Sequence, residues 1–239
     1  MKNKKSKIIL ILILTVISVL FIAPIVIVFM NSFKSKLFIN STPFAFPNAD
    51  SFVGLANYGE GMIKTGFLQA FFITLFITVA SVFLIVVLTS MTAWYLIRVK
   101  SRFTKVMYYL FAFAMIVPFQ MVMFTLVKVS NMFNLDNLIG IIFIYVGFGA
   151  GLSVFMFTGF IKSIPVSLEE AAMIDGCSIM QIYFKIVFPV IRPIIMTVAI
   201  LNAMWIWNDY LLPYLVIIKQ FLWQSNISEV DMDQLTLDL

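Results

Sequence analysis

The sequence of 239 residues contains no histidine and a single cysteine, Cys177. Without histidine, neither a zinc-binding HExxH motif nor a Ser-His-Asp triad can be built. One cysteine cannot form an internal disulfide or a cysteine-rich metal site. The chain also lacks the G-x-x-x-x-G-K-[ST] phosphate loop, so it is not itself a P-loop ATPase. We therefore expect no enzyme active site of these kinds and no bound cofactor.

Charge is scarce as well, since only 11% of the residues are Asp, Glu, Lys or Arg, whereas 62% are hydrophobic. The mean hydropathy is +1.07. Water-soluble domains carry charge on roughly a quarter of their residues. Apolar runs of about 20 residues are long enough to cross a bilayer as helices. The composition therefore predicts an all-α polytopic membrane protein, a helical bundle in contact with the lipid bilayer.

Five apolar segments are predicted to span the membrane: residues 8–30, 67–97, 106–127, 138–161 and about 190–206. The first follows a cluster of lysines, but it is longer than the apolar core of about 7–15 residues in a cleaved signal peptide. We therefore expect it to be retained. Pro118 and Gln120 predict a local break near the middle of the third segment. Glycines recur through the fourth segment and are suited to tight helix packing.

The basic residues are unevenly distributed between the ends of these segments. Most of the 16 lie at the N-terminus, in residues 98–105 and in residues 162–192. Cytoplasmic loops of membrane proteins carry an excess of Lys and Arg. The pattern therefore predicts a cytoplasmic N-terminus, and it explains the net charge of +5 without nucleic-acid binding.

A polar interruption between the fourth and fifth segments carries helix-start patterns. Two pairs of residues match a capping box, in which two side chains satisfy backbone N–H groups reciprocally: Ser167 with Glu170, and Ser178 with Gln181. Gly176 lies between them, where a helix end favours a residue that tolerates positive φ. Residues 167–189 are therefore predicted to form a short helix, a glycine turn and a second helix that stops or kinks at Pro189. An amphipathic loop lying on the lipid surface is the alternative.

Three stretches at fixed spacings carry a resemblance: Glu170-Ala171-Ala172, Asp175-Gly176 and Ile186-Val187-Phe188-Pro189. They resemble the "EAA" loop of the inner-membrane permeases of ABC importers. In that family the loop is the cytoplasmic coupling helix that docks into a cleft on the ATPase subunit. The resemblance implies a helical bundle of the type I ABC importer permease kind, in a bacterial cytoplasmic membrane.

The resemblance also implies roles for the residues of this loop. The expected ATPase-coupling residues are Glu170, Ala171, Ala172, Asp175, Gly176 and Pro189. The two alanines are small, so the helix can sit deep in a cleft. Glu170 is expected both to cap the helix and to pair with a basic ATPase residue, and local capping alone is the alternative. Asp175 and Gly176 are expected to end the helix and set the angle to the next one.

The fifth segment ends in Trp207-Asn208-Asp209-Tyr210-Leu211-Leu212-Pro213. Trp and Tyr are typical of a membrane–water interface. The stretch resembles the W-N-[DE]-[FY]-x-x-P signature of sugar-importer permeases and indicates the carbohydrate branch, of the maltose and glycerol-phosphate type. Intramembrane polar residues are functional candidates, so the expected substrate-path residues are Gln120, Asn202, Asn208 and Asp209. A packing hydrogen bond is the alternative for Gln120.

The end of the chain departs from the family pattern of six spans. Residues 219–239 are polar and acidic and are not expected to cross lipid. We therefore expect a permease domain in residues 1–218, with the coupling loop at 163–189, and a tail that does not match the family. A truncated or frame-shifted copy is the simplest explanation.

Together these features predict a permease subunit that moves a sugar or related polyol and is not an enzyme. The resemblance implies three protein partners: a second homologous permease subunit, an ABC ATPase dimer and an extracytoplasmic solute-binding protein. Two alternatives stay open. One is a membrane-embedded enzyme, which the lack of histidine disfavours. The other is a non-transporting subunit that only binds partners.

Overall fold

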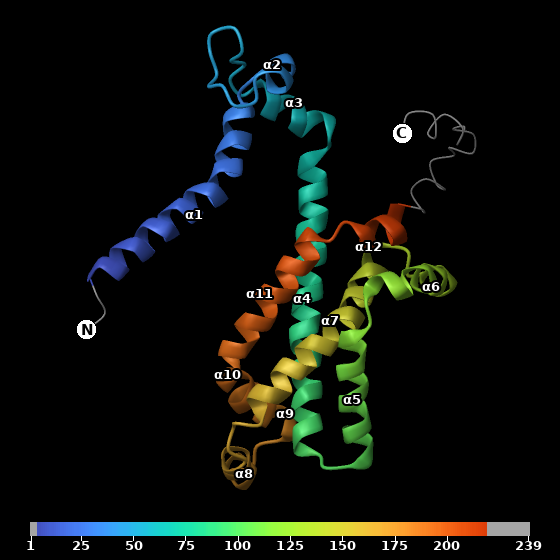
Figure 1. The fold of residues 1–239 in the computed structure, drawn as a ribbon. Helices are drawn as coiled ribbons and strands as arrows, with labels where there is room; N and C mark the ends of the chain where they lie inside the picture. Colours follow the sequence, from blue (N-terminus) through green and yellow to red (C-terminus); the bar gives the residue numbers. More distant parts are fainter. Residues whose placement is uncertain (1–3, 219–239) are drawn as a thin grey trace. The chain divides into compact units, whose positions relative to one another are not determined.

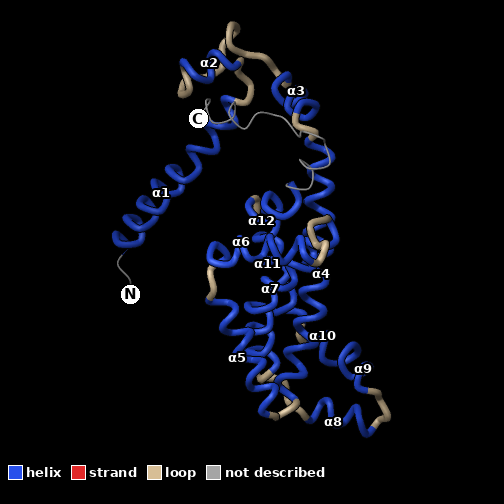
Figure 2. Tube along the Cα trace, turned by 90° about the vertical axis from the view of Figure 1, so that its right-hand side faces the viewer, coloured by secondary structure: helices blue, strands red, loops and turns tan. Residues whose placement is uncertain are grey.

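The computed structural model describes residues 4–218, and apart from one isolated bridge between Lys34 and Phe52 the regular structure in that range is helical. The elements are α1 (Lys4–Asn31), α2 (Lys36–Ser41), α3 (Ala56–Lys64), α4 (Phe67–Arg98), α5 (Arg102–Ile116), α6 (Phe119–Met132), α7 (Leu138–Ile161), α8 (Ser167–Ile174), α9 (Ile179–Ile182), the π-helix η1 (Tyr183–Val187), α10 (Phe188–Val190), α11 (Arg192–Asn208), α12 (Leu211–Pro213) and the π-helix η2 (Tyr214–Ile218) (Figure 1). The chain divides into two compact units, residues 1–72 and 73–239. The predicted all-α architecture is confirmed (Figure 2).

The first unit combines the long apolar helix α1 with a polar segment that folds on itself. Asn31 donates a hydrogen bond to the carbonyl of Pro43 at 2.7 Å, and Asn57 donates to the carbonyl of Lys34 at 2.8 Å. The Lys34 side chain is fully buried, and its ammonium donates to the carbonyl of Thr42 at 2.9 Å. Side chains thus satisfy backbone carbonyls where regular structure is short.

The second unit is a bundle in which α7 packs against both α5 and α11. A turn of three residues joins α4 to α5, and Ser101 with Thr104 caps α5 in a capping box. Large fully buried side chains fill the space between the helices, among them Ile85, Ile141, Tyr145, Phe157 and Tyr183. The α4–α5 turn and α8 lie at the same end of this unit (Figures 1 and 2).

Two glycines of α7 permit close approach of neighbouring helices. A Cβ at Gly149 would lie 2.7 Å from Cδ1 of Ile85 and 2.8 Å from Oδ1 of Asn202. A Cβ at Gly151 would lie 2.9 Å from the carbonyl oxygen of Phe111. Small residues at such positions let membrane helices pack closely. The predicted role of glycine is therefore confirmed here, whereas the space beside Gly147 and Gly159 is open.

The third predicted span is sharply bent rather than continuous. Helices α5 and α6 meet at 107°, at the break that Pro118 predicts. Proline lacks an N–H group and disfavours helical backbone in the residue before it. Val117 accordingly adopts φ −72° and ψ 116°, an extended conformation that ends α5. The break predicted near the middle of the span at residues 106–127 is therefore confirmed.

The fifth predicted span, about residues 190–206, corresponds to α11, and a bend of 77° separates α11 from the preceding helical stretch Ile179–Val190. Pro189 does not end the helix, because it lies inside α10, directly after the π-helix η1. The interruption comes at Ile191, before Pro193 in the first turn of α11. The predicted stop or kink at Pro189 is therefore misplaced by two residues. Pro189 lies in the first turn of α10, where a proline costs no hydrogen bond.

Three helices of the described residues are long and apolar enough to cross a membrane: residues 7–31, 67–98 and 138–161. The number rises to five when each bent pair is counted as one span. The five predicted spans therefore correspond to the three unbroken helices, the bent pair of α5 and α6, and α11, which is the second helix of the other bent pair.

The close approach at Gly149 leads to a stability prediction. We expect Gly149→Ala to lower the stability of the bundle by about 1–3 kcal/mol, because an added methyl group overpacks the contact with α4 and α11. The measurement is the thermal unfolding midpoint of the purified chain in detergent. Gly147→Ala is the matched control, since nothing lies within 4 Å of its Cβ position, and it should leave the midpoint unchanged or higher. Equal midpoints for the two variants would contradict the packing argument.

Candidate functional site

The helix–turn–helix predicted between the fourth and fifth segments is present, but α8 starts earlier than its first capping pattern indicates. The residue before the helix is Val166, with helical φ −63° and ψ −29°, and Ser167 lies inside the first turn. The carbonyl of Val166 accepts from the N–H groups of Glu169 and Glu170 at 2.9 and 3.0 Å. The Ser167 capping box is therefore wrong. The helical backbone of Val166 accounts for the shift, because it places Ser167 inside the first turn rather than at the cap position.

The end of α8 follows the prediction. Gly176 has φ +82°, and its N–H donates to the carbonyl of Met173 at 3.1 Å. The N–H of Cys177 donates to the carbonyl of Ala172 at 2.9 Å. This pair of bonds is a Schellman motif, in which a glycine in the left-handed region closes the helix.

The second capping pattern is confirmed at the start of α9. The N–H of Ser178 donates to Oε1 of Gln181 at 2.8 Å, and the N–H of Gln181 donates to the Ser178 hydroxyl at 3.4 Å. The chain then continues through η1 and α10. Short π-helical segments are frequent at functional sites.

A buried carboxylate fastens α8 to the end of α4. Glu169 is 3% exposed, and its Oε1 accepts from Nη2 and Nε of Arg98 at 2.7 and 2.9 Å. Its Oε2 accepts from the indole Nε1–H of Trp94 at 3.0 Å. Arg98 Nη2 also donates to the carbonyl of Ile164 at 3.2 Å. Charge-assisted bonds of this kind are stronger than neutral ones, so α8 is tied to α4 at several atoms.

A second contact joins α4 to the other arm of the helix–turn–helix. Tyr183, in η1, is fully buried, and its hydroxyl lies 2.6 Å from the Ser90 hydroxyl of α4. The ring of Tyr183 lies 5.5 Å from that of Trp94. Trp94 therefore contacts both arms, through Glu169 on one side and Tyr183 on the other. These contacts hold both arms of the helix–turn–helix against α4.

Sequence reasoning missed this anchor. It singled out Glu170, whose side chain is exposed, rather than its buried neighbour Glu169. The i, i+3 spacing places Glu169 on one helix face with Ala172, but it places Glu170 on a face with Met173 equally well, so spacing alone does not identify the anchor. Glu169 and Ala172 are the buried pair. Arg98 stood out only as one member of a basic loop.

The outward face of α8 carries acidic and apolar side chains. Glu170, Ala171, Asp175 and Gly176 are exposed, whereas Ala172 is 5% exposed and Pro189 is half-buried. Three large apolar side chains are exposed beside them: Leu168, Met173 and Ile174. Ile174 is 87% exposed. Apolar side chains clustered on a polar surface are typical of an interaction site.

The four predicted substrate-path residues do not form one cluster. Asn202 of α11 is buried and donates to the Ser153 hydroxyl of α7 at 3.1 Å. Gln120 lies exposed in the first turn of α6, and Asn208 is exposed at the end of α11, where it donates to a backbone carbonyl. Asn202 thus makes a packing contact between helices in this conformation.

Asp209 occupies a separate position at the end of α11. Its Oδ2 accepts from the Tyr145 hydroxyl of α7 at 3.1 Å, and its Oδ1 accepts from the N–H of Leu211 at 3.1 Å. The ring of Tyr145 meets that of Trp205 edge-on at 5.5 Å. The W-N-D-Y stretch thus joins α7 to α11 and starts α12.

Residues 4–218 contain no group of three or more His, Cys, Asp or Glu side chains arranged to hold a metal ion.

Curated relatives of the chain are named as sugar permeases. It is 44% identical, over 204 residues, to the probable starch degradation products transport system permease protein AmyC of Thermoanaerobacterium thermosulfurigenes, with 85% of this chain and 73% of that protein covered. It is 35% identical to the multiple sugar-binding transport system permease protein MsmG of Streptococcus mutans, with 86% and 74% covered. It is 32% identical to the melibiose/raffinose/stachyose import permease protein MelC of Bacillus subtilis, with 86% and 74% covered.

A solved structure shares the fold. The crystal structure of a bacterial ABC transporter involved in the import of the acidic polysaccharide alginate contains a chain that superposes with a TM-score of 0.78 at 22% identity, covering 99% of this chain and 87% of that one. Residues 85–234 match the family described as binding-protein-dependent transport system inner membrane component, a range that reaches into the predicted tail. The chain therefore belongs to this family of inner-membrane transport permeases.

Proposed function

We propose that this chain is a permease subunit of an ABC importer that moves a sugar or related polyol across the bacterial cytoplasmic membrane. The observation that carries the proposal is the α8 helix–turn–helix, anchored to α4 by buried Glu169 and exposing an apolar and acidic face. Family membership supports it. The permease domain at residues 1–218, with its coupling loop at 163–189, belongs to the same proposal.

The relatives support a carbohydrate substrate. AmyC, MsmG and MelC are named for starch degradation products, multiple sugars and melibiose, raffinose or stachyose. The W-N-D-Y stretch at residues 207–210 supports the same branch. The alternative of a subunit that only binds partners is not favoured, because all three relatives are named as permeases.

The proposed coupling partner is an ATPase dimer that grips the outward face of α8. Glu170 and Asp175 offer negative charge to a basic cleft, and exposed Ala171 allows close approach. Leu168 and Ile174 supply apolar area, 46% and 87% exposed. A second homologous permease and an extracytoplasmic solute-binding protein complete the proposed assembly, and the family description itself includes a binding protein.

Force on α8 would reach the bundle through α4. Glu169 and Tyr183 link the two arms of the helix–turn–helix to the last three turns of that helix. A partner shifts a conformational equilibrium only when its contacts differ between the two states. ATP-driven closure of the ATPases meets this requirement if it moves α8, because α4 then tilts with it. The bends at Pro118 and Ile191 mark where α5–α6 and α10–α11 can change angle.

Gly176 is expected to set the coupling angle. We expect Gly176→Glu to abolish ATP-driven solute uptake, at least tenfold, because a side chain at φ +82° strains the turn and displaces α9. The measurement is uptake and solute-stimulated ATP hydrolysis in proteoliposomes. Gly54→Glu is the matched control, since Gly54 also has positive φ (+59°) and open space, yet lies far along the sequence from the loop. Normal solute stimulation in Gly176→Glu would contradict the role.

The two neighbouring glutamates are expected to have different roles: Glu169 anchors α8 to α4, and Glu170 contributes to recognition by the ATPase. We expect Glu169→Gln to lower stability by about 3 kcal/mol, because it leaves the guanidinium of Arg98 without its buried partner. Glu170→Gln should change stability by no more than about 0.5 kcal/mol, as an exposed substitution, yet weaken ATPase association. The measurements are thermal unfolding and co-purification of the ATPase.

A double variant tests the pair directly. If the ion pair is the anchor, Glu169→Gln and Arg98→Met should be strongly non-additive in stability. Additive effects, or equal unfolding midpoints for Glu169→Gln and Glu170→Gln, would argue against it.

The orientation is testable through the single cysteine. We expect a membrane-impermeant maleimide to label Cys177 in inside-out vesicles and not in intact cells, since the loop is proposed to be cytoplasmic. Cys177→Ala with Lys36→Cys is the control, because a cytoplasmic N-terminus and a first span at residues 8–30 put residues 31–66 outside, and Lys36 is exposed. That variant should show the reverse pattern. Labelling of Cys177 from intact cells would overturn the topology.

A further inference from the structure

A basic cavity of about 500 Å³ lies at the turn between α4 and α5, beside the end of α7. Its lining includes four basic side chains, Lys100, Arg102, Lys105 and Lys162, together with the ring of Tyr108. The Lys162 ammonium lies 5.6 Å from the centre of that ring, a cation–π contact that holds the charge over the cavity.

Within the described residues, no carboxylate pairs with any of the four basic side chains. Among residues 4–218, the ion pairs are Lys64 with Glu60 and Arg98 with Glu169. The cavity therefore concentrates positive charge that the described part of the chain does not neutralise. Such a concentration attracts an anion with several acceptor oxygens, of which a phosphate is the natural example.

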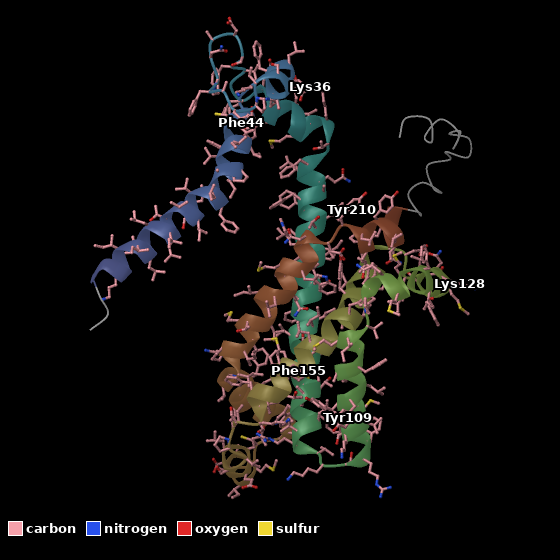
Figure 3. All side chains as sticks on the ribbon, in the orientation of Figure 1. Lys36, Phe44, Tyr109, Lys128, Phe155 and Tyr210 are labelled. Atoms are coloured by element: carbon pink, nitrogen blue, oxygen red, sulfur yellow. The ribbon has the colours of Figure 1, made fainter. Side chains whose placement is uncertain are left out.

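The basic cavity adjoins an apolar groove of about 560 Å³. The two share Tyr108 and Lys162, and Phe155, Phe160 and Ile194 are among the side chains that line the groove. Figure 3 places Phe155 on α7. Gly159 also lines the groove, and nothing lies within 4 Å of its Cβ position. The groove is therefore open where an apolar chain would run beside α7.

The cavity stands at the ends of apolar helices, since α4 ends at Arg98 and α5 begins at Arg102. In a membrane permease these ends lie at the boundary between hydrocarbon and water, where Lys and Arg extend toward phosphates. Basic pockets between membrane helices at this level bind anionic lipid headgroups. A soluble acidic protein would use the charges but leave the apolar groove empty.

We propose that the cavity and groove together bind one anionic phospholipid. Its phosphate lies among Lys100, Arg102, Lys105 and Lys162, and one acyl chain runs along the groove past Gly159. This inference goes beyond the proposed function and does not depend on the solute or the ATPase. Ile97 and Val99, which flank Arg98, line the same cavity. The lipid therefore contacts the last turn of α4, which carries Arg98, the partner of Glu169.

The test uses the full chain, purified in mild detergent with the subunits that accompany it. Native mass spectrometry measures retention of phosphatidylglycerol and of zwitterionic phosphatidylcholine at equal concentration. At about 1 kcal/mol for each basic side chain near a lipid surface, Lys105→Gln with Lys162→Gln should weaken phosphatidylglycerol retention about 30-fold. The control is Lys36→Gln with Lys128→Gln, which removes the same charge. Lys36 lies on α2 and Lys128 on α6 (Figure 3), and neither lines the cavity or groove.

Further measurements separate a lipid from other anions. Gly159→Leu should reduce phosphatidylglycerol retention by filling the groove, and glycerol phosphate, which has no acyl chain, should not displace the lipid. Equal retention of the two lipids, equal effects of the two double variants, or displacement by glycerol phosphate would overturn the proposal. If Lys105→Gln with Lys162→Gln released an accompanying acidic subunit and left lipid retention unchanged, the cavity would be a protein-binding site and the proposal would be wrong. Solute uptake by the wild-type assembly is measured separately and tests the proposed function. The lipid-retention result does not depend on its outcome.

Discussion

The structure of the coupling end depends on one buried charge. Glu169 is removed from solvent, so its carboxylate is stable only while Arg98 and Trp94 donate to it. Removing one member of a buried pair leaves an uncompensated charge, which costs about 3–5 kcal/mol. Helix α8 therefore cannot leave α4 without a large loss of free energy. This constraint makes the two helices behave as one body at this end of the bundle.

The burial of Glu169 also explains the unusual outward face of α8. An amphipathic helix ordinarily buries its apolar side and exposes its charges. Here a carboxylate faces the bundle, while Leu168 and Ile174 face outward with Glu170. The inward-facing carboxylate of α8 is thus paired with Arg98, whereas the apolar side chains on its outward face remain exposed. An external apolar and acidic face of this kind is suited to burial against a partner with a basic cleft.

The rest of the second unit holds this end in place through close helix contacts. Gly149 and Gly151 bring α7 close to α4, α11 and α5, so the helices that carry the anchor share one packed core. The bends at Pro118 and Ile191 turn α6 and α10 away from the bundle axis. The second unit thus combines close helix contacts in its middle with sharp bends toward its ends.

Local chemistry alone determined part of this arrangement. The glycine turn at Gly176 and the capping box of Ser178 and Gln181 depend on residues within a few positions of each other, so the sequence predicts them correctly. The apolar runs likewise determined the helical membrane class, and Pro118 the position of a break. The predicted cap at Ser167 was wrong because Val166 already has helical backbone and takes the cap position, and the sequence did not predict the angle of 107° at Pro118. Only the tertiary structure decided which glutamate of α8 faces inward. Arg98 and Trp94 lie about 70 residues earlier in the chain, and no local pattern reveals which carboxylate they will reach.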